Sequence, residues 1–267
     1  MNQTFNMTLS STLTIPSMMT SLSSRPISSS STTPNFFTMT LVLLLGPIIE
    51  ILGSLIIQRW FLPASIQTSA QRIFKWRTSL IARVNAGITG VLAVWALNDN
   101  DVLITDLLHG RTTASMYVII FSLGVHVAET AEMILYGQYS FLTIHHIGAV
   151  ACLFSSWQLQ LAHGFGLVFL VTEINAVFNK TRILHLVADV DRNSSEYIIN
   201  SYINVITFFM RVLIVAWLHG QNFQLFVETP NFFFTTCFLC TTFINFWNMT
   251  CFKTLVIKDI LRKKKIL

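Results

Sequence analysis

Seven runs of mainly apolar residues divide this chain, and most approach the about 20 residues that an α-helix needs to cross a bilayer. The fourth and fifth runs are separated only at His163–Gly164, which predicts a tight helical hairpin. Because the fifth run is short, six spans remain an alternative. The pattern predicts an all-α, polytopic membrane protein with about seven transmembrane helices, at roughly residues 36–58, 80–97, 114–135, 141–162, 164–178, 200–218 and 231–252.

The segments on either side of these runs differ from them in composition. Residues 1–35 are rich in Ser and Thr and hold a single charge, Arg25. A segment of this kind cannot bury enough apolar area to order itself, so it is predicted to be a disordered tail. Residues 256–267 form a short basic tail. The membrane domain is therefore expected to occupy residues 36–255.

Composition supports a membrane environment. Hydrophobic residues make up 53% of the chain and charged residues only 11%, whereas a soluble globular domain carries about 25% charged residues. The net charge of +5 comes from short basic clusters between apolar runs, which fits membrane topology and argues against nucleic-acid binding. The four cysteines lie in apolar segments without zinc-site spacing, so no metal or cofactor is expected.

The distribution of basic residues predicts the orientation. With the N-terminus outside the cytosol, seven spans place 13 basic residues in cytosolic loops and the C-terminal tail, and leave only Arg25 and Arg111 outside. Basic residues concentrate on the cytosolic side of membrane proteins, so this bias favours a lumenal N-terminus and a cytosolic C-terminus.

Two short motifs agree with that orientation and predict an endoplasmic reticulum (ER) membrane protein. Asn2 and Asn6 begin glycosylation sequons in the predicted lumenal tail, although a Ser/Thr-rich segment also produces sequons by chance. Lys264 and Lys265 match the dilysine pattern that coat proteins recognise when they return cytosol-facing tails to the ER. A basic cluster after a last span also satisfies the orientation rule without any retrieval function.

Ionisable residues inside the predicted spans are the main functional candidates, because a charge at a helix centre costs about 2.5–3.5 kcal/mol on insertion scales. So many on one small bundle cannot all face lipid, and they predict a polar cavity between the helices. They are Glu50, Arg83, His126, Glu129, Glu132, His145, His146, Glu173 and Arg211.

The predicted topology brings several of these side chains to one depth. Glu129 and Glu132 fall in the cytosolic half of the third span, and the adjacent His145 and His146 lie near the cytosolic end of the fourth. Glu173 lies toward the same side in the fifth span. A histidine can remove a proton from a hydroxyl or amine while a carboxylate orients it. We therefore predict that these histidines, with Glu129 or Glu173, form a catalytic group.

Adjacent histidines point about 100° apart on a helix, so one is expected to face the cavity and the other to pack against a neighbouring helix. The residues predicted to line the substrate cavity are His126, Glu132, Asn175 and Arg211. The alternative is that intramembrane polar groups only hold helices together through hydrogen bonds. That interpretation is favoured for Glu50 and Arg83, and it applies to Arg211 as well.

Two stretches resemble the TLC-domain family, which includes ceramide synthases, translocon-associated membrane proteins and the ceroid-lipofuscinosis-linked ER protein. One stretch is FLTIHHIGAVACLFSSW at residues 141–157, and the other is GFGLVFLVTEINAVFN at residues 164–179. Ceramide synthases carry His-Asp-x-x-Asp in the helix after the histidine pair, where this chain has Thr172-Glu173 and then Ala176. The resemblance is therefore to the non-synthase branch, the ceroid-lipofuscinosis-linked protein and TLC-domain-containing proteins.

This resemblance implies ER residence and a role in lipid metabolism, lipid sensing or lipid homeostasis. The first hypothesis is an acyltransferase that takes acyl-CoA from the cytosol as co-substrate and acts on a membrane lipid with His145 or His146 as general base. The second is a lipid-binding or escort protein with lumenal cargo and no catalysis, although its predicted lumenal loops are short. A third is that the polar residues serve only to hold the bundle together.

Overall fold

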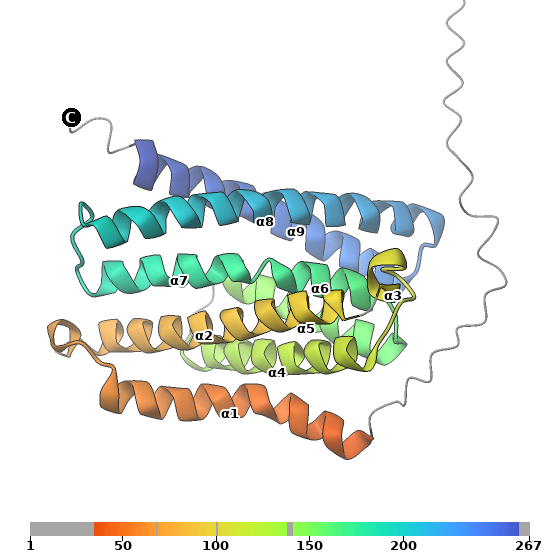
Figure 1. Cartoon of the computed structure of the whole chain (residues 1–267), viewed down its shortest axis with the longest axis horizontal. Coiled ribbons are helices and arrows are strands. Elements are labelled where there is room, and N and C mark those ends of the chain that lie inside the picture. Colours follow the sequence, from red (N-terminus) through yellow and green to blue (C-terminus); the bar gives the residue numbers. More distant parts are fainter. Residues whose placement is uncertain (1–34, 68, 100, 138–140, 262–267) are drawn as a thin grey trace, which may run out of the picture. The chain divides into compact units, whose positions relative to one another are not determined.

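The computed structural model describes residues 35–67, 69–99, 101–137 and 141–261. These residues fold into helices without any β-strand, which confirms the predicted all-α class (Figure 1). The predicted tail at 1–35, apart from Asn35, and the retrieval motif at Lys264 and Lys265 lie outside the described residues. The helices are α1 (Phe36–Trp60), α2 (Ala70–Asn98), α3 (Val102–Thr105), α4 (Thr113–Leu135), α5 (Phe141–Leu159), α6 (His163–Val171), α7 (Ile174–Val187), α8 (Ser195–Glu228) and α9 (Phe232–Leu255), with a 3₁₀ turn η1 (Ala64–Ile66) and a π-helical turn η2 (Val256–Leu261).

Helices form at every predicted span. By length and composition, α1, α2, α4 and α8 qualify as membrane spans among the described residues. The other three predicted spans correspond to α5, to α9 and to α6 followed by α7. The chain is thus a multi-pass α-helical membrane protein, while the number of seven spans stays a prediction.

Six of the described helices form a ring around the interior of the bundle. Each helix packs against the next in the order α2, α7, α8, α9, α5 and α4, and α4 returns to α2. Helix α6 continues the line of α7 and packs against α2, α4 and α8 (Figure 1). Helix α1 lies outside this ring against α4 and α2. The ring leaves space at its centre for the polar side chains of its members.

Close helix packing outside the ring relies on two glycines. A Cβ atom on Gly124 of α4 would collide with the backbone of Leu43, and one on Gly46 of α1 would collide with the backbone of Val125. Small residues at such crossings let two helix backbones approach within the membrane. The remaining face of α1 carries exposed apolar side chains, as expected for contact with lipid.

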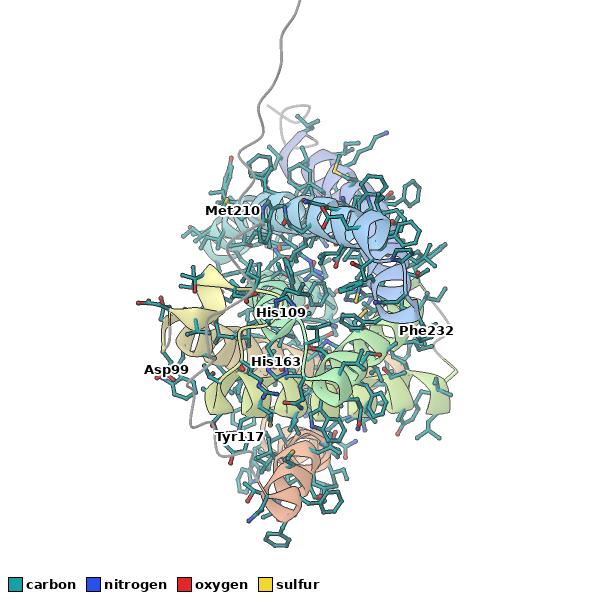
Figure 2. The ribbon with its side chains drawn as sticks, turned by 90° about the vertical axis from the view of Figure 1, so that its right-hand side faces the viewer. Asp99, His109, Tyr117, His163, Met210 and Phe232 are labelled. Atoms are coloured by element: carbon teal, nitrogen blue, oxygen red, sulfur yellow. The ribbon has the colours of Figure 1, made fainter. Side chains whose placement is uncertain are left out.

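The end of the bundle that carries α3 is closed by the chain itself. The backbone N–H groups of Ala162 and Phe165 donate hydrogen bonds to the carbonyl groups of Leu108 and Leu107, at 2.6 and 3.4 Å. Figure 2 views the bundle from this end, where His163 lies in the interior and Phe232 and Met210 lie at the periphery. Backbone hydrogen bonds therefore join the connecting segments at the α3 end of the bundle.

The structure corrects several predicted boundaries. The fifth predicted span, at 164–178, is not one short helix but two helical segments that reach from His163 to Val187 and are interrupted at Thr172 and Glu173. Lys180 and Arg182, predicted in a cytosolic loop, lie on α7. The predicted lumenal loop at 219–230 is mostly the end of α8. Apolar runs mark where a helix crosses lipid, but a helix continues wherever its backbone bonds and packing permit.

Candidate functional site

A central cavity of about 420 Å³ lies inside the helical ring. It extends from the middle of the bundle toward η2, and its walls combine aliphatic side chains with charged and amide groups. This size and mixture are typical of a small-molecule site, in which a few polar groups orient a largely apolar ligand. The polar lining residues are Asn85, Thr89, His126, Glu129, His145, His146, Glu173, Asn175, Asn179, Lys180, Arg182, Arg211, Asn248, Thr250, Cys251, Thr254 and Lys258.

Both members of the histidine pair line the cavity, whereas the sequence predicted that only one would. His145 and His146 are buried, with 7% and 8% of their surface exposed. Their rings lie 5.5 Å apart at an interplanar angle of 84°. His126 of α4 joins them, with its ring centroid 5.4 Å from that of His146.

Glu129 is the nearest carboxylate to this histidine group. Its Oε2 atom lies 3.4 Å from Nδ1 of His146, an ion-pair distance without the direction of a hydrogen bond. On the other side, the Asn85 amide donates to Glu129 at 3.5 Å and to the buried Glu50 of α1 at 3.0 Å. A line of polar contacts thus runs from α1 through α2 to the histidines, and it holds Glu129 beside His146.

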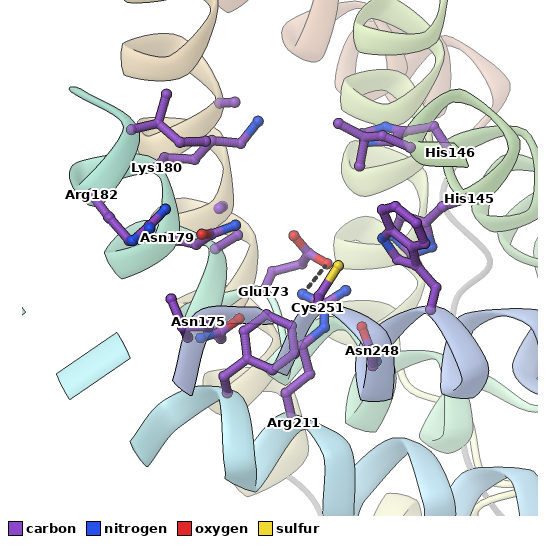
Figure 3. Close-up of a pocket in the computed structure, with 18 of the residues that line it drawn as sticks. His145, His146, Glu173, Asn175, Asn179, Lys180, Arg182, Arg211, Asn248 and Cys251 are labelled. Carbon is purple, nitrogen blue, oxygen red and sulfur yellow. Dashed lines mark ion pairs between the residues drawn. The ribbon is translucent and has the colours of Figure 1, made fainter. Parts of the chain in front are cut away.

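The break between α6 and α7 places Glu173 in the cavity. Around it the backbone forms short i→i+3 hydrogen bonds, from Glu173 to Leu170 at 3.0 Å and from Ala176 to Glu173 at 2.8 Å. Irregular backbone at membrane depth is tolerated where it lines a cavity. Arg211 of α8 contacts both residues of this break. Its guanidinium lies 3.6 Å from the Glu173 carboxylate (Figure 3), and it donates a hydrogen bond to the Thr172 carbonyl at 3.4 Å.

The remaining predicted cavity residues fall into two groups. Asn175 lines the cavity and also ties α7 to α8, because its amide donates to the side chains of Asn204 and Thr207 at 3.1 and 2.9 Å. Glu132 is not among the lining residues. It pairs with Arg77 of α2 at 2.9 Å, so it joins two helices. Although Glu129 and Glu132 are three residues apart on α4, only Glu129 lines the cavity.

Several lining residues were missed from the sequence. Asn179 and Arg182 follow the predicted Asn175 by four and seven residues, so the three form a polar stripe on one face of α7 that helical periodicity could have revealed. Asn85 and Asn248 were not predicted because their side chains are uncharged amides, whereas the candidates in the apolar runs were chosen mainly for their charge. Among the described residues, no three His, Cys, Asp or Glu side chains come together in a way that could hold a metal ion.

A second, smaller cavity of about 70 Å³ lies between α5, α6, α8 and α9 and is almost entirely apolar. Phe169 lines it and also contacts the ring of His145, with centroids 6.2 Å apart. Cys152 and Cys237 face each other across it, with their Sγ atoms 3.9 Å apart. The His145–Phe169 contact therefore separates a polar cavity from an apolar one.

The fold and the site define a class: a polytopic α-helical membrane protein whose helices enclose a polar, histidine-containing cavity. The chain matches the TLC domain over residues 75–257, and it belongs to the TLC-domain family. Proteins of this family are associated with membrane lipids.

Three relatives illustrate how distant the similarity is. TLC domain-containing protein 1 of Mus musculus is 22% identical over 152 residues, which cover 55% of this chain and 61% of that protein. The Gallus gallus protein of the same name is 23% identical over 55% of this chain and 59% of its own length. TLC domain-containing protein 2 of Danio rerio is 27% identical over 57% of this chain and 63% of its own length. The chain spans about three fifths of the length of the curated relatives it matches.

Proposed function

We propose that this chain is an acyl-CoA-dependent acyltransferase that remodels a membrane lipid. The observation that carries this proposal is the pairing of His146 with Glu129 at 3.4 Å in the central cavity, which a second histidine also lines. A neutral histidine beside a carboxylate can act as a general base.

The proposed reaction needs only one proton relay. His146 removes a proton from a hydroxyl or amine of the acceptor lipid, while Glu129 orients the ring and stabilises its charged form. The acceptor oxygen or nitrogen forms a bond to the thioester carbonyl, and the carbon–sulfur bond breaks. The proton then passes from His146 to the departing thiolate, so the products are an acylated lipid and free coenzyme A. Glu173 and Arg211 lie beside the reacting groups, and Glu173 is in electrostatic range of His145.

The two cavities fit the two parts of such a substrate. The central cavity offers polar groups for a thioester and an acceptor head group. The second cavity is apolar and begins behind His145, where it is suited to part of an acyl chain. Apolar chain atoms gain about 0.8 kcal/mol for each buried CH₂ group, so such a cavity would favour one chain geometry over others.

A lipid-binding or lipid-sensing protein without catalysis is the second candidate. It is favoured by the side-chain contacts themselves, because both carboxylates that line the cavity already have a partner: Glu173 has the guanidinium of Arg211, and Glu129 has the imidazole of His146. A set of satisfied pairs can hold the bundle together and still leave room for a lipid. The escort form of this hypothesis is less well supported, since the segments between helices at 106–112 and 229–231 offer little surface for lumenal cargo.

A reconstituted transfer assay separates these candidates. Purified protein in lipid nanodiscs is expected to convert radiolabelled acyl-CoA and a mixture of lysophospholipids into acylated lipid with release of free coenzyme A. Mass spectrometry of the product identifies the acceptor, and lipid profiles of cells lacking the protein should show the same product depleted. A different result would support a lipid-binding protein without catalysis: lipid co-purifies with the protein, but acyl-CoA is not consumed with any of the acceptor lipids.

We also infer an ER location with a lumenal N-terminus and a cytosolic C-terminus, from the charge bias, the sequons at Asn2 and Asn6 and the dilysine motif. Replacing Lys264 and Lys265 with serine is expected to release the protein to later secretory compartments, because coat-protein recognition would be lost. Immunofluorescence and endoglycosidase H sensitivity of the N-terminal glycans measure this, and Lys263→Ser is the control. Wild-type protein outside the ER would contradict the location, and absence of N-terminal glycans would contradict the lumenal N-terminus. Retention of the Lys264 and Lys265 variant in the ER would contradict retrieval by the dilysine motif.

A further inference from the structure

The charges that line the central cavity do not balance. Four of its lining side chains are cationic, namely Lys180, Arg182, Arg211 and Lys258, and only Glu129 and Glu173 are carboxylates. Those two carboxylates are already engaged by His146 and Arg211. The excess positive charge lies on α7 and η2, at the end of the bundle opposite α3 (Figure 1).

One of the four cations is neutralised from outside the cavity. Arg182 forms a two-pronged ion pair with the buried Asp259 of η2, one contact of which is 2.9 Å long. The Tyr197 hydroxyl donates to the same carboxylate at 3.3 Å. Three elements therefore meet at Asp259, and they fix η2 against α7 and α8. Because Lys258 directly precedes Asp259, this contact also holds the backbone of Lys258 at the cavity.

Lys180 and Lys258 are the two cations that remain. Among the described residues, neither has a carboxylate within ion-pair distance. Lys180 is half-buried on α7, and its side chain extends into the space between α7 and α5 (Figure 3). It interacts electrostatically with Glu129, Glu173 and His146, so it lies close to the proposed reacting groups. Lys258 is exposed at the η2 end.

We propose that Lys180 and Lys258 bind a phosphate group of the ligand that occupies the central cavity. Lysine ammonium groups bind phosphate oxygens through charge-assisted hydrogen bonds, and two lysines from separate elements can engage two oxygens of one phosphate. The buried amide of Asn248, whose Nδ2 has no hydrogen-bond partner among the described residues, supplies a further donor that lines the same cavity. The phosphate belongs either to the soluble thioester co-substrate or to the head group of an anionic phospholipid.

This proposal rests on the proposed function only for the identity of the two phosphate sources. Its test measures ligand binding and needs no catalytic activity. One arm measures binding of coenzyme A, which lacks an acyl chain, to the full-length protein in nanodiscs of neutral phosphatidylcholine. The other measures enrichment of phosphatidylglycerol around the protein in mixed nanodiscs, by native mass spectrometry. The variants are Lys180→Glu, Lys258→Glu and their combination, and Lys253→Glu on the exposed surface of α9 is a control with the same change of charge.

Each cavity variant is expected to weaken binding about tenfold, either of coenzyme A or of phosphatidylglycerol, because one charge-assisted hydrogen bond is lost. The control Lys253→Glu should bind both ligands like wild type. Loss in the coenzyme A arm identifies the co-substrate as the phosphate source, and loss in the phospholipid arm identifies the head group. Unchanged binding in both arms overturns the proposal, as does an equal loss in Lys253→Glu, which would indicate only a diffuse surface effect. Because His146→Ala should leave coenzyme A binding intact, failure of catalysis and failure of this site give different results. Lys180→Gln repeats the test if the charge reversal prevents folding.

Discussion

His146→Ala is expected to lower the rate of acyl transfer by about 10²–10⁴-fold, the usual contribution of a positioned general base. His126 cannot take its place, because it belongs to another helix and its Nδ1 is hydrogen-bonded to the Ser122 carbonyl at 2.8 Å. His145 lines the same cavity, but among the described residues it has no carboxylate within ion-pair distance. Glu129→Gln should reduce the rate less, because the ring remains in place while its charged form loses stabilisation. The measurement is acylated lipid formed per minute by purified protein at saturating acyl-CoA.

The control for that prediction is His219→Ala. His219 lies half-buried on α8, stacked on Phe238 at 5.2 Å and outside the central cavity, so its loss removes a ring of the same size without touching the site. It should transfer acyl groups at the wild-type rate. If His146→Ala also keeps full activity, the proposed mechanism is wrong. If its activity falls only together with its thermal stability, His146 has a structural role.

The sequence located most of this site because charged groups inside apolar runs are rare and conspicuous. His126, Glu129, His145, His146, Glu173, Asn175 and Arg211 all line one cavity, although only one of the two adjacent histidines was predicted to face it, and their catalytic and binding roles stay predictions. Glu132 is the exception, since a difference of three residues along α4 turns its side chain toward Arg77 of α2. Whether a polar group faces a cavity or a neighbouring helix depends on rotation within the bundle, which hydropathy does not report.

Helix ends and interruptions were harder to predict. Thr172 and Glu173 interrupt the apolar run from Gly164 to Phe178, but Glu129 and Glu132 do the same within the unbroken α4, so composition alone does not mark the break that carries Glu173 into the cavity. Lys180 was assigned to a loop because basic residues mark the cytosolic side of a span. That rule gives the side of the membrane, and it does not say whether the residue stands on a loop or on a helix that continues past the apolar run.

The second large effect is expected for Arg211→Met, which should lower the free energy of unfolding by about 3–5 kcal/mol. The side chains of Arg211 and Glu173 are only 10% and 14% exposed, so loss of the guanidinium leaves a buried carboxylate without its partner. Methionine fills a similar length without charge. Thermal and denaturant unfolding in detergent micelles measure the change, and the double variant Arg211→Met with Glu173→Gln should recover part of it because the unpaired charge is also removed.

An exposed ion pair provides the comparison for this prediction. Arg72 and Asp189 also form a salt bridge, but their side chains are 36% and 68% exposed, and such pairs contribute only about 0–1 kcal/mol. Arg72→Met should therefore unfold close to wild type. Equal stability losses in the two methionine variants would show that burial of the Glu173–Arg211 pair does not matter, and a double variant no more stable than Arg211→Met would show the two residues to be uncoupled. Strong coupling would instead mean that the ion pair at the break between α6 and α7 helps to hold the cavity open, because the same arginine also binds the Thr172 carbonyl that the break sets free.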